Sequence, residues 1–173
     1  MATLTTAPTL TTQRLVLRGP EREDLPALTR FMTSAPSMIA QGETVTAEQA
    51  WFGFLTGVGH WQWHGFGFFT VVLRQTGHPV GRVGLLKHAG WPDVELAWHL
   101  FEGAEGKGFA TEAAIAVKTW AHEGLGLDRL YSYIDRGNTR SQAVAGRLGA
   151  VTDGTRAPHE PEAEVWVHPV EDP

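Results

Sequence analysis

The chain contains no cysteine, and this absence excludes several kinds of chemistry. A thiol nucleophile, a disulfide bond and a thiolate metal site all need that side chain, so none of them is available. Runs of lysine and arginine are also missing and the net charge is −5, so we expect no nucleic-acid partner. No stretch of about 18 apolar residues occurs, so we expect no membrane-spanning segment.

The N-terminal residues 1–8 lack a basic segment followed by an apolar run, so we expect no signal peptide and a cytoplasmic protein. The length of 173 residues suits one domain with a hydrophobic core. Residues 1–173 are therefore expected to form a single domain, with residues 1–9 as a flexible tail. The mildly acidic charge suits a cationic substrate such as an amine.

Hydrophobic periodicity predicts the order of the elements along the chain. Strands are predicted at residues 14–18, 66–73, 80–87, 94–100 and 127–134, with one or two more at 151 and 163–167. Helices are predicted after the N-cap candidates Asp24, Thr46 and Asn138, and over residues 109–123. A run of strands followed by alternating strands and helices is typical of an α+β fold whose mixed sheet has one parallel pair near its middle.

A glycine-rich segment lies between the predicted strand 94–100 and the alanine-rich helix that follows it. Glycine lets the backbone approach a ligand closely, and the first amides of a helix have no partner within the helix. Together with the helix dipole, these amides favour an anion such as a phosphate. The residues expected to bind it are Gly106, Lys107, Gly108, Phe109, Ala110 and Thr111.

Other interpretations of this segment can be compared with the residues. A Walker loop needs Lys and then Ser or Thr after its last glycine, and Gly108 is followed by Phe109. A dinucleotide-binding fingerprint needs a third glycine where Thr111 stands. Neither motif fits, which leaves an anion site of another kind or a tight loop without a ligand.

Four stretches of the chain resemble the GNAT superfamily of acyl-CoA-dependent N-acetyltransferases, in family order and at family spacing. They are residues 13–18, 95–100, 105–113 and 138–150, and they are similar to the branch that includes ribosomal-protein-alanine N-acetyltransferases. The resemblance implies a GNAT-like fold: a central mixed, mostly antiparallel sheet of six to seven strands flanked by about four helices. It also implies acetyl-CoA as co-substrate at the glycine-rich segment, no metal, and a possible homodimer.

The resemblance assigns roles to residues of the predicted strand 94–100. Glu95 matches a family glutamate often assigned as the catalytic base, although it could also face solvent or pair with Arg82. The family splays its central strand at a bulge, where free backbone groups bind the pantetheine arm. By position this implicates His99 and Leu100 in binding the cofactor.

The last helix is expected to supply a proton donor for the departing thiolate. Many family members use a tyrosine at the position of Ala145, so Ser141 is the candidate here, as in the branch that this chain resembles. Asn138 and Ser141 are also expected to contact the cofactor, but both fit ordinary chemistry of a helix N-terminus. Glu105 departs from the family pattern, which has Gln or Arg at that position.

These residues predict an enzyme that transfers an acetyl group from acetyl-CoA to a primary amine by direct attack in a ternary complex. The acceptor is a protein N-terminus or a small-molecule amine. An α-amine titrates near ~7.7–8.0 and a lysine side chain near ~10.4, so an N-terminal substrate makes the smaller demand on a base. The alternative is a non-catalytic acyl-CoA-binding sensor or scaffold. His60 and His64 lack a carboxylate pattern and are expected on a solvated face, not on a metal.

Overall fold

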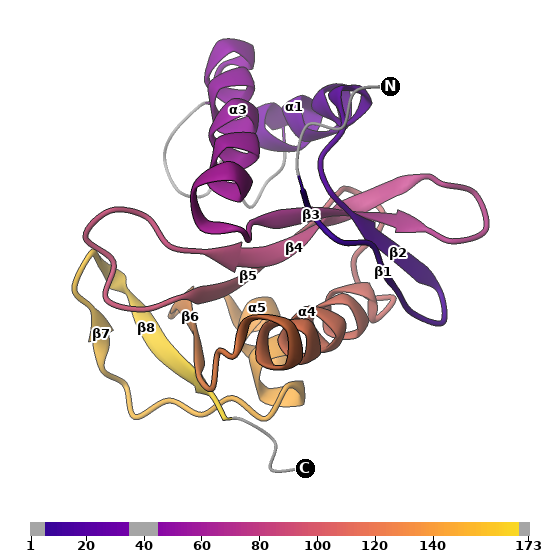
Figure 1. The fold of residues 1–173 in the computed structure, drawn as a ribbon. Helices are drawn as coiled ribbons and strands as arrows, with labels where there is room; N and C mark the ends of the chain where they lie inside the picture. The colour runs from indigo at the N-terminus through magenta and orange to yellow at the C-terminus, as the bar shows by residue number, and fades with distance from the viewer. Residues whose placement is uncertain (1–5, 35–44, 170–173) are drawn as a thin grey trace.

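The computed structural model describes residues 6–34 and 45–169, which form one eight-stranded sheet with helices on both faces (Figure 1). The strands are β1 (Leu10–Thr11), β2 (Leu15–Arg18), β3 (Phe68–Leu73), β4 (Pro79–Leu86), β5 (Glu95–Leu100), β6 (Leu130–Asp135), β7 (Arg156–Ala157) and β8 (Glu160–His168). The helices are the short 3-10 turn η1 (Arg22–Asp24), α1 (Leu25–Ser34), α3 (Ala47–His64), α4 (Phe109–Leu125) and α5 (Thr139–Arg147).

The predicted α+β fold is confirmed, with eight strands in place of the six to seven expected. The strands run in the order β1-β2-β3-β4-β5-β6-β8-β7, and every neighbouring pair is antiparallel except β5 and β6. The edge strands β1 and β7 have two residues each, too few to show a periodic pattern in the sequence.

The parallel pair in the middle of the sheet is in register at a single position, where Glu95 lies opposite Tyr131. On its other side, β5 pairs with β4 along its whole length, from Glu95 to Leu100. The strands β5 and β6 therefore separate beyond Glu95. Because the β4–β5 register has no shift, the bulge predicted at His99 and Leu100 is wrong, and the separation of two strands takes its place.

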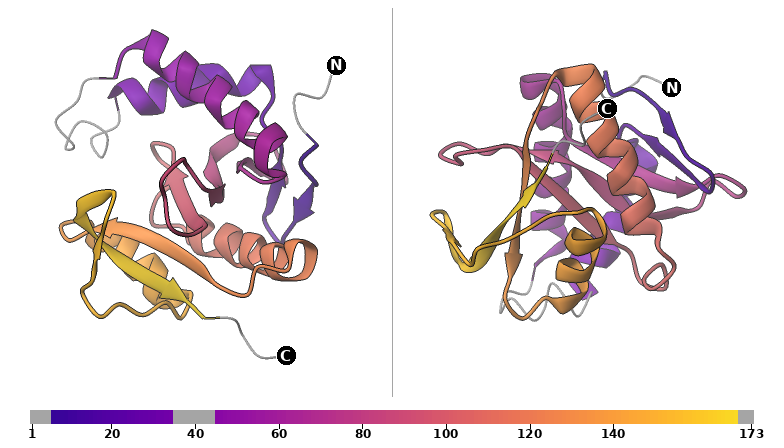
Figure 2. Two further views of the ribbon diagram at one scale, coloured as in Figure 1. Left: turned by 60° about the vertical axis from the view of Figure 1, so that its left-hand side comes forward. Right: turned by 90° about the horizontal axis from the view of Figure 1, so that it is seen from below.

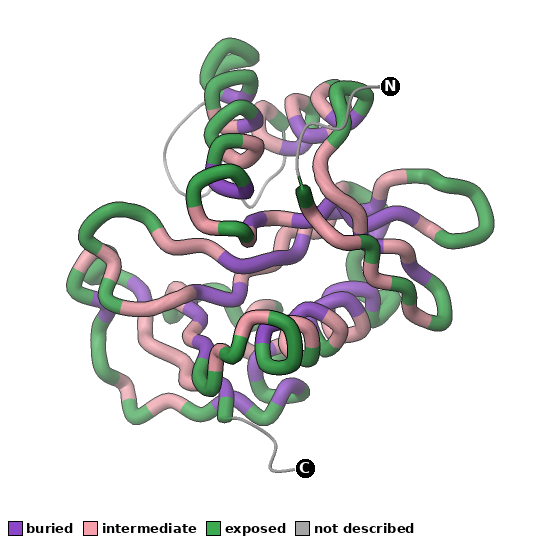
Figure 3. The backbone as a smooth tube through the Cα atoms, viewed as in Figure 1, coloured by how far each residue is buried: buried purple, intermediate pink, exposed green. Residues whose placement is uncertain are grey.

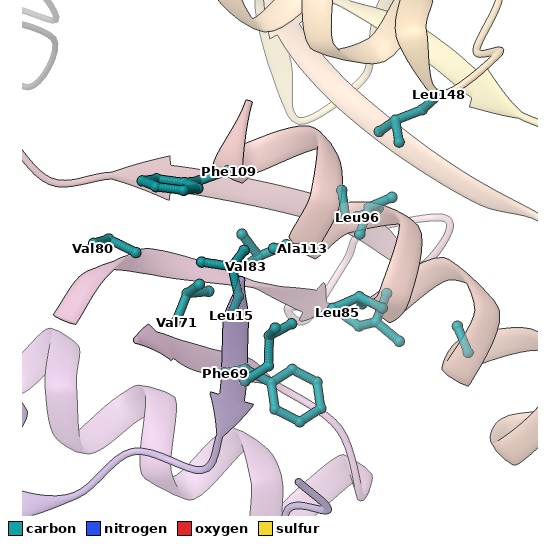
Figure 4. Close-up of a cluster of buried hydrophobic side chains, with 14 of the residues drawn as sticks. Leu15, Phe69, Val71, Val80, Val83, Leu85, Leu96, Phe109, Ala113 and Leu148 are labelled. Atoms are coloured by element: carbon teal, nitrogen blue, oxygen red, sulfur yellow. The ribbon is translucent and has the colours of Figure 1, made fainter. Parts of the chain in front are cut away.

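Helices α1 and α3 cover one face of the sheet, while α4 and α5 lie on the other, as Figures 1 and 2 show. Small residues form the inner face of α4, where Ala113, Ala114, Val117 and Ala121 have no exposed surface. They let the helix lie close to β4 and β5. Figure 3 shows buried residues in purple both along the central strands and along α4. Figure 4 shows Val83, Leu85 and Leu96 of the sheet in this core.

Two predictions about the first residues of elements had different outcomes. Thr46 caps α3 as expected, and its side chain accepts a hydrogen bond from the Gln49 amide at 3.1 Å. Asp24 does not cap α1; its carboxylate turns back to accept from the Glu21 amide at 2.8 Å. Residues 1–5 of the predicted tail lie outside the described residues, whereas Ala7 packs against the core.

Candidate active site

A cleft of about 1230 Å³ opens where β5 and β6 separate. Its walls come from β5 and β6, from the loop and first turn of α4, and from α5. It brings together most of the residues that the sequence predicts for the site: Glu95, His99, Leu100, Gly106, Gly108, Ala110, Thr111, Asn138 and Ser141. Lys107 of the loop and Phe109, the first residue of α4, do not line the cleft. The Lys107 ammonium is bonded to the Gly103 carbonyl, and Phe109 packs into the core.

The loop before α4 takes its shape from glycines in the left-handed region. Gly106 has φ 73° and Gly108, the N-cap of α4, has φ 79°. Other residues rarely adopt such angles, so this loop geometry needs glycine at both positions. The first amides of α4 thereby face the cleft beside Ala110 and Thr111, in the arrangement that favours an anion.

Glu105, the residue that departs from the family pattern, is tied into the loop itself. Its carboxylate accepts a hydrogen bond from the Gly103 amide at 3.0 Å. The Lys107 ammonium donates to the Gly103 carbonyl at 2.7 Å. The two side chains thus brace the loop from both sides of Gly103, although Glu105 also lines the cleft.

Arg14 is a contributor to the site that the sequence does not reveal. Its guanidinium pairs with Glu112 of α4 at 2.6 Å and donates to the Lys107 carbonyl at 2.9 Å. Glu112 also accepts from Thr12, and these bonds and the Arg14 charge keep the pKa of its carboxyl below the usual range despite some desolvation. Arg14, which directly precedes β2, therefore holds the loop and balances a carboxylate near the expected anion site.

Glu95 lies at the other end of the cleft and is 9% exposed. Burial raises the pKa of its carboxyl to about 8, and nearby Glu160 adds to the rise. One long hydrogen bond, from the Tyr133 amide at 3.4 Å, opposes the shift. The alternative partner Arg82 does not reach Glu95, because its Nε–H donates to Nδ1 of His99 at 2.9 Å.

The cleft around Glu95 is acidic. Glu160 is close enough to raise the pKa of Glu95, and Asp135, at the end of β6, lines the same cleft. The pKa of Glu160 is itself raised first by burial and then by the charge of Asp135. The described residues give neither Asp135 nor Glu160 an ion-pair partner. The cleft therefore suits a positively charged group near these carboxyl groups.

Ser141 lies in the first turn of α5 with its hydroxyl in the cleft. Asn138 is the N-cap of that helix, and its side chain accepts from the Ser141 amide at 3.1 Å. The Ser141 hydroxyl accepts from the indole N–H of Trp98 at 3.3 Å, which leaves its own proton free to be donated. Ala145 is fully buried against Ile134 and Ala150, so a tyrosine has no space at that position.

A family model described as an acetyltransferase (GNAT) domain matches residues 14–151. The chain belongs to the GNAT acetyltransferase family. It is 36% identical to the acetyltransferase from Agrobacterium tumefaciens str. C58, whose structure superposes with a TM-score of 0.86 over 96% of this chain and 97% of the other.

Two further relatives extend the comparison. The uncharacterized N-acetyltransferase YnaD of Bacillus subtilis is 25% identical over 157 residues, 91% of each protein. The RimL ribosomal L7/L12 alpha-N-protein acetyltransferase, solved with coenzyme A, has a TM-score of 0.76 over 94% of this chain and 98% of its own, at 14% identity. The similarity to RimL shows that the two proteins share a fold.

The GNAT chain is thus an acetyl-CoA-dependent acetyltransferase, and its residues fit that co-substrate. The loop has open space at Gly106, which lines the cleft, since a Cβ there would meet no atom within 4 Å. The start of α4 offers amide donors that suit phosphate oxygens. The backbone of β5 that faces away from β4 has no strand partner after Glu95 among the described residues. That edge suits a chain carrying amide groups.

Two negative findings hold for the described residues, 6–34 and 45–169. They contain no cluster of His, Asp and Glu that could hold a metal ion. None of their helices has the length and apolar character needed to cross a membrane.

Proposed function

We propose that this GNAT protein transfers the acetyl group of acetyl-CoA directly to a primary amine while both substrates are bound. The observation that carries the proposal is the position of Glu95, a buried carboxylate in the same cleft as the anion-binding loop. Direct transfer needs the amine and acetyl-CoA bound together, and a cleft with a base at one end and a cofactor site at the other can hold both. Acetyl-CoA supplies the activated acyl group and a thiol leaving group.

Glu95 acts as the general base, through a water molecule or directly, and takes the proton that the amine loses. Its pKa of about 8 suits this role because a base works best when its pKa lies near that of the proton donor and near the working pH. An α-ammonium group, at about 7.7–8.0, loses its proton to such a base at little cost. A lysine ammonium, at about 10.4, would lose it against a gap of over two pKa units.

Ser141 donates a proton toward the departing sulfur. The Asn138 side chain holds the Ser141 amide and the Trp98 indole holds the hydroxyl oxygen, so the hydroxyl is fixed within the cleft. A thiol has a pKa near ~8.5, so the leaving group needs only modest help from a donor. Ser141 therefore contributes less to the rate than Glu95.

The acceptor favoured by this site is an α-amine, at a protein N-terminus or in a small molecule. The match between the Glu95 pKa and that of an α-amine supports it, as do the carboxyl groups of Asp135 and Glu160 that line the cleft. The RimL structure of the same fold is named an alpha-N-protein acetyltransferase, which is in line with this choice.

A test is thiol release from acetyl-CoA in the presence of alaninamide, an alanyl peptide, lysine side-chain analogues and a polyamine. Wild-type protein should release thiol fastest with the α-amines, and Glu95→Gln should lose most of that rate. Binding of coenzyme A in calorimetry without turnover of any amine would instead favour the non-catalytic acyl-CoA sensor. Equal turnover by wild type and Glu95→Gln would remove the role of Glu95.

A further inference from the structure

A row of polar residues crosses four strands on the face of the sheet that α1 and α3 cover. The registers place Arg18 of β2 opposite Thr70 of β3, Thr70 opposite Arg82 of β4, and Arg82 opposite His99 of β5. Only the last member, His99, lines the active-site cleft. The row therefore connects a buried polar network to the place where the acceptor binds.

The charges in this row do not balance. Asp24 accepts two hydrogen bonds of 2.8 Å from Arg18 and one of 2.7 Å from Thr70, so its carboxylate is already neutralised. Arg82 is partly buried, and the described residues give it no carboxylate partner. Its guanidinium lies 4.5 Å from the ring centre of Phe68, which compensates the charge in part. One excess positive charge therefore lies directly behind His99.

The bond from Arg82 determines which nitrogen of His99 carries the proton. An arginine side chain has donors and no acceptor, so Nδ1 of His99 must accept the 2.9 Å hydrogen bond from Arg82 Nε–H. A neutral imidazole then carries its proton on Nε2. Burial and the Arg82 charge lower the pKa of His99 to about 3, so the ring stays neutral and cannot serve as a base near pH 7.

The orientation of the ring is also fixed. His99 lies between Phe31 of α1 and Phe68 of β3, with ring centres 5.5 Å and 5.4 Å away. The described residues offer Nε2 no acceptor, since the one hydrogen bond of the ring is made by Nδ1. By the alternation of a strand, His99 and Glu95 point to the same face of β5. A fixed donor thus stands in the cleft on the side where the base lies.

We propose that His99 is a specificity-determining residue whose Nε2–H donates a hydrogen bond to an oxygen beside the reacting amine of the acceptor, and that Arg82 is the positioning residue that holds it in this tautomer. The inference rests on the proposed function and deepens it. The acceptor class that satisfies both ends of the site is an α-amino carbonyl compound, with its amine toward Glu95 and its carbonyl or carboxylate oxygen at His99. The positive charge of Arg82 behind the ring strengthens this hydrogen bond.

The test compares two acceptors of similar amine basicity, alaninamide and 2,2-difluoroethylamine, of which only the first has a carbonyl oxygen. The measured quantity is the ratio of their kcat/KM values at equal free-base concentrations. Wild type should favour alaninamide roughly tenfold, the size of effect expected for one hydrogen bond to a buried donor. The ratio should fall toward one in His99→Phe, which keeps the ring between Phe31 and Phe68, and should be largely retained in His99→Gln, which keeps a donor.

The role of Arg82 is tested by the tautomer of His99, a quantity that would not change if Arg82 only stabilised the fold. Nitrogen-15 NMR of wild type should show His99 as the Nε2–H tautomer, and Arg82→Met should show a mixture of tautomers and a smaller acceptor ratio. Arg82→Lys, which keeps a charged donor, should restore part of the ratio. An Nδ1–H tautomer in wild type would overturn the inference without the need of any variant.

The outcomes separate this inference from the function on which it rests. A wild type that acetylates both acceptors at equal kcat/KM contradicts the role of His99 and leaves the proposed function standing. An unchanged ratio of the two kcat/KM values in His99→Phe would also contradict the role of His99 and leave the proposed function standing. A wild type that acetylates neither these acceptors nor any amine contradicts the proposed function and the inference together.

Discussion

Nε of Arg14 lies 2.6 Å from Oε2 of Glu112, so that the start of β2 is bonded to the first turn of α4. The same guanidinium reaches the Lys107 carbonyl and lies 4.8 Å from the ring centre of Phe109. It is 45% exposed, and exposed ion pairs add little to stability. Its main effect is therefore expected on the order of the anion-binding loop.

Arg14→Ala should weaken coenzyme A binding about fivefold, as expected for the loss of roughly 1 kcal/mol of hydrogen bonding to the loop. Its free energy of unfolding should change by less than about 1 kcal/mol. Calorimetry with coenzyme A gives the first quantity and urea unfolding the second. Arg22→Ala removes the same charge from an exposed position in η1 and is the control. Equal affinities in the two variants would show that Arg14 does not organise the loop.

Gly108→Val should destabilise the protein and also reduce its affinity for coenzyme A. Gly108 has φ 79°, and a Cβ there would lie 3.4 Å from the Arg14 guanidinium. Gly77 in the β3–β4 hairpin has φ 70° and open space around it, so Gly77→Val is a control with similar backbone strain far from the cleft. The strain should cost each variant about 1–2 kcal/mol. Coenzyme A affinity should fall in Gly108→Val alone, and an equal affinity in both would contradict an anion site at this loop.

Ser141→Ala should lower kcat roughly tenfold with little change in stability. The estimate is below the usual range for a proton donor because thiolate is a good leaving group. The matched variant is Asn138→Ala, which removes the N-cap of α5 and should cost about 1 kcal/mol of stability. Steady-state kinetics and thermal unfolding of both variants separate the two roles. An unchanged kcat in Ser141→Ala would leave Ser141 as a helix residue only.

Glu95 should make the protein less stable as the pH rises. Its pKa is about 8 when folded and near 4.5 in an ordinary environment, so the folded state holds the proton more tightly. The stability that this proton contributes is complete below about pH 4.5 and is lost as the pH rises through about 8. Urea unfolding over this interval should show that the free energy of unfolding of wild type falls relative to that of Glu95→Gln as the pH rises. A difference independent of pH would mean that the Glu95 pKa is not raised.

The sequence predicts the elements whose signals are local. The glycine loop, the Asn138 cap and the strand beginning at Glu95 each depend on residues within a few positions of one another. The single parallel pair near the middle of a mixed sheet follows from general rules of connection. The cleft was not predicted, because it depends on the separation of β5 and β6, and the resemblance implied a bulge in its place.

Contacts between distant segments could not be predicted in this way. The bonds of Arg14 to Glu112 and of Arg82 to His99 depend on how strands and helices align in space. His60 was expected on a solvated face but is buried, with Nδ1 at 2.7 Å from the Phe66 carbonyl and Nε2 accepting from the Lys87 amide. Nothing in the spacing of His60 and His64 indicates those backbone partners.

The most direct test of Glu95 as the base is the pH dependence of kcat with an alanyl peptide, at saturating peptide and acetyl-CoA. Under these conditions kcat reports groups in the ternary complex rather than the free amine. Wild type should show kcat rising with pH, reaching half of its maximum near pH 8, the pKa of Glu95, and levelling above it. Glu95→Gln should lose that inflection and have a kcat about 100-fold lower. A variant within about twofold of wild type and with the same inflection would contradict the account.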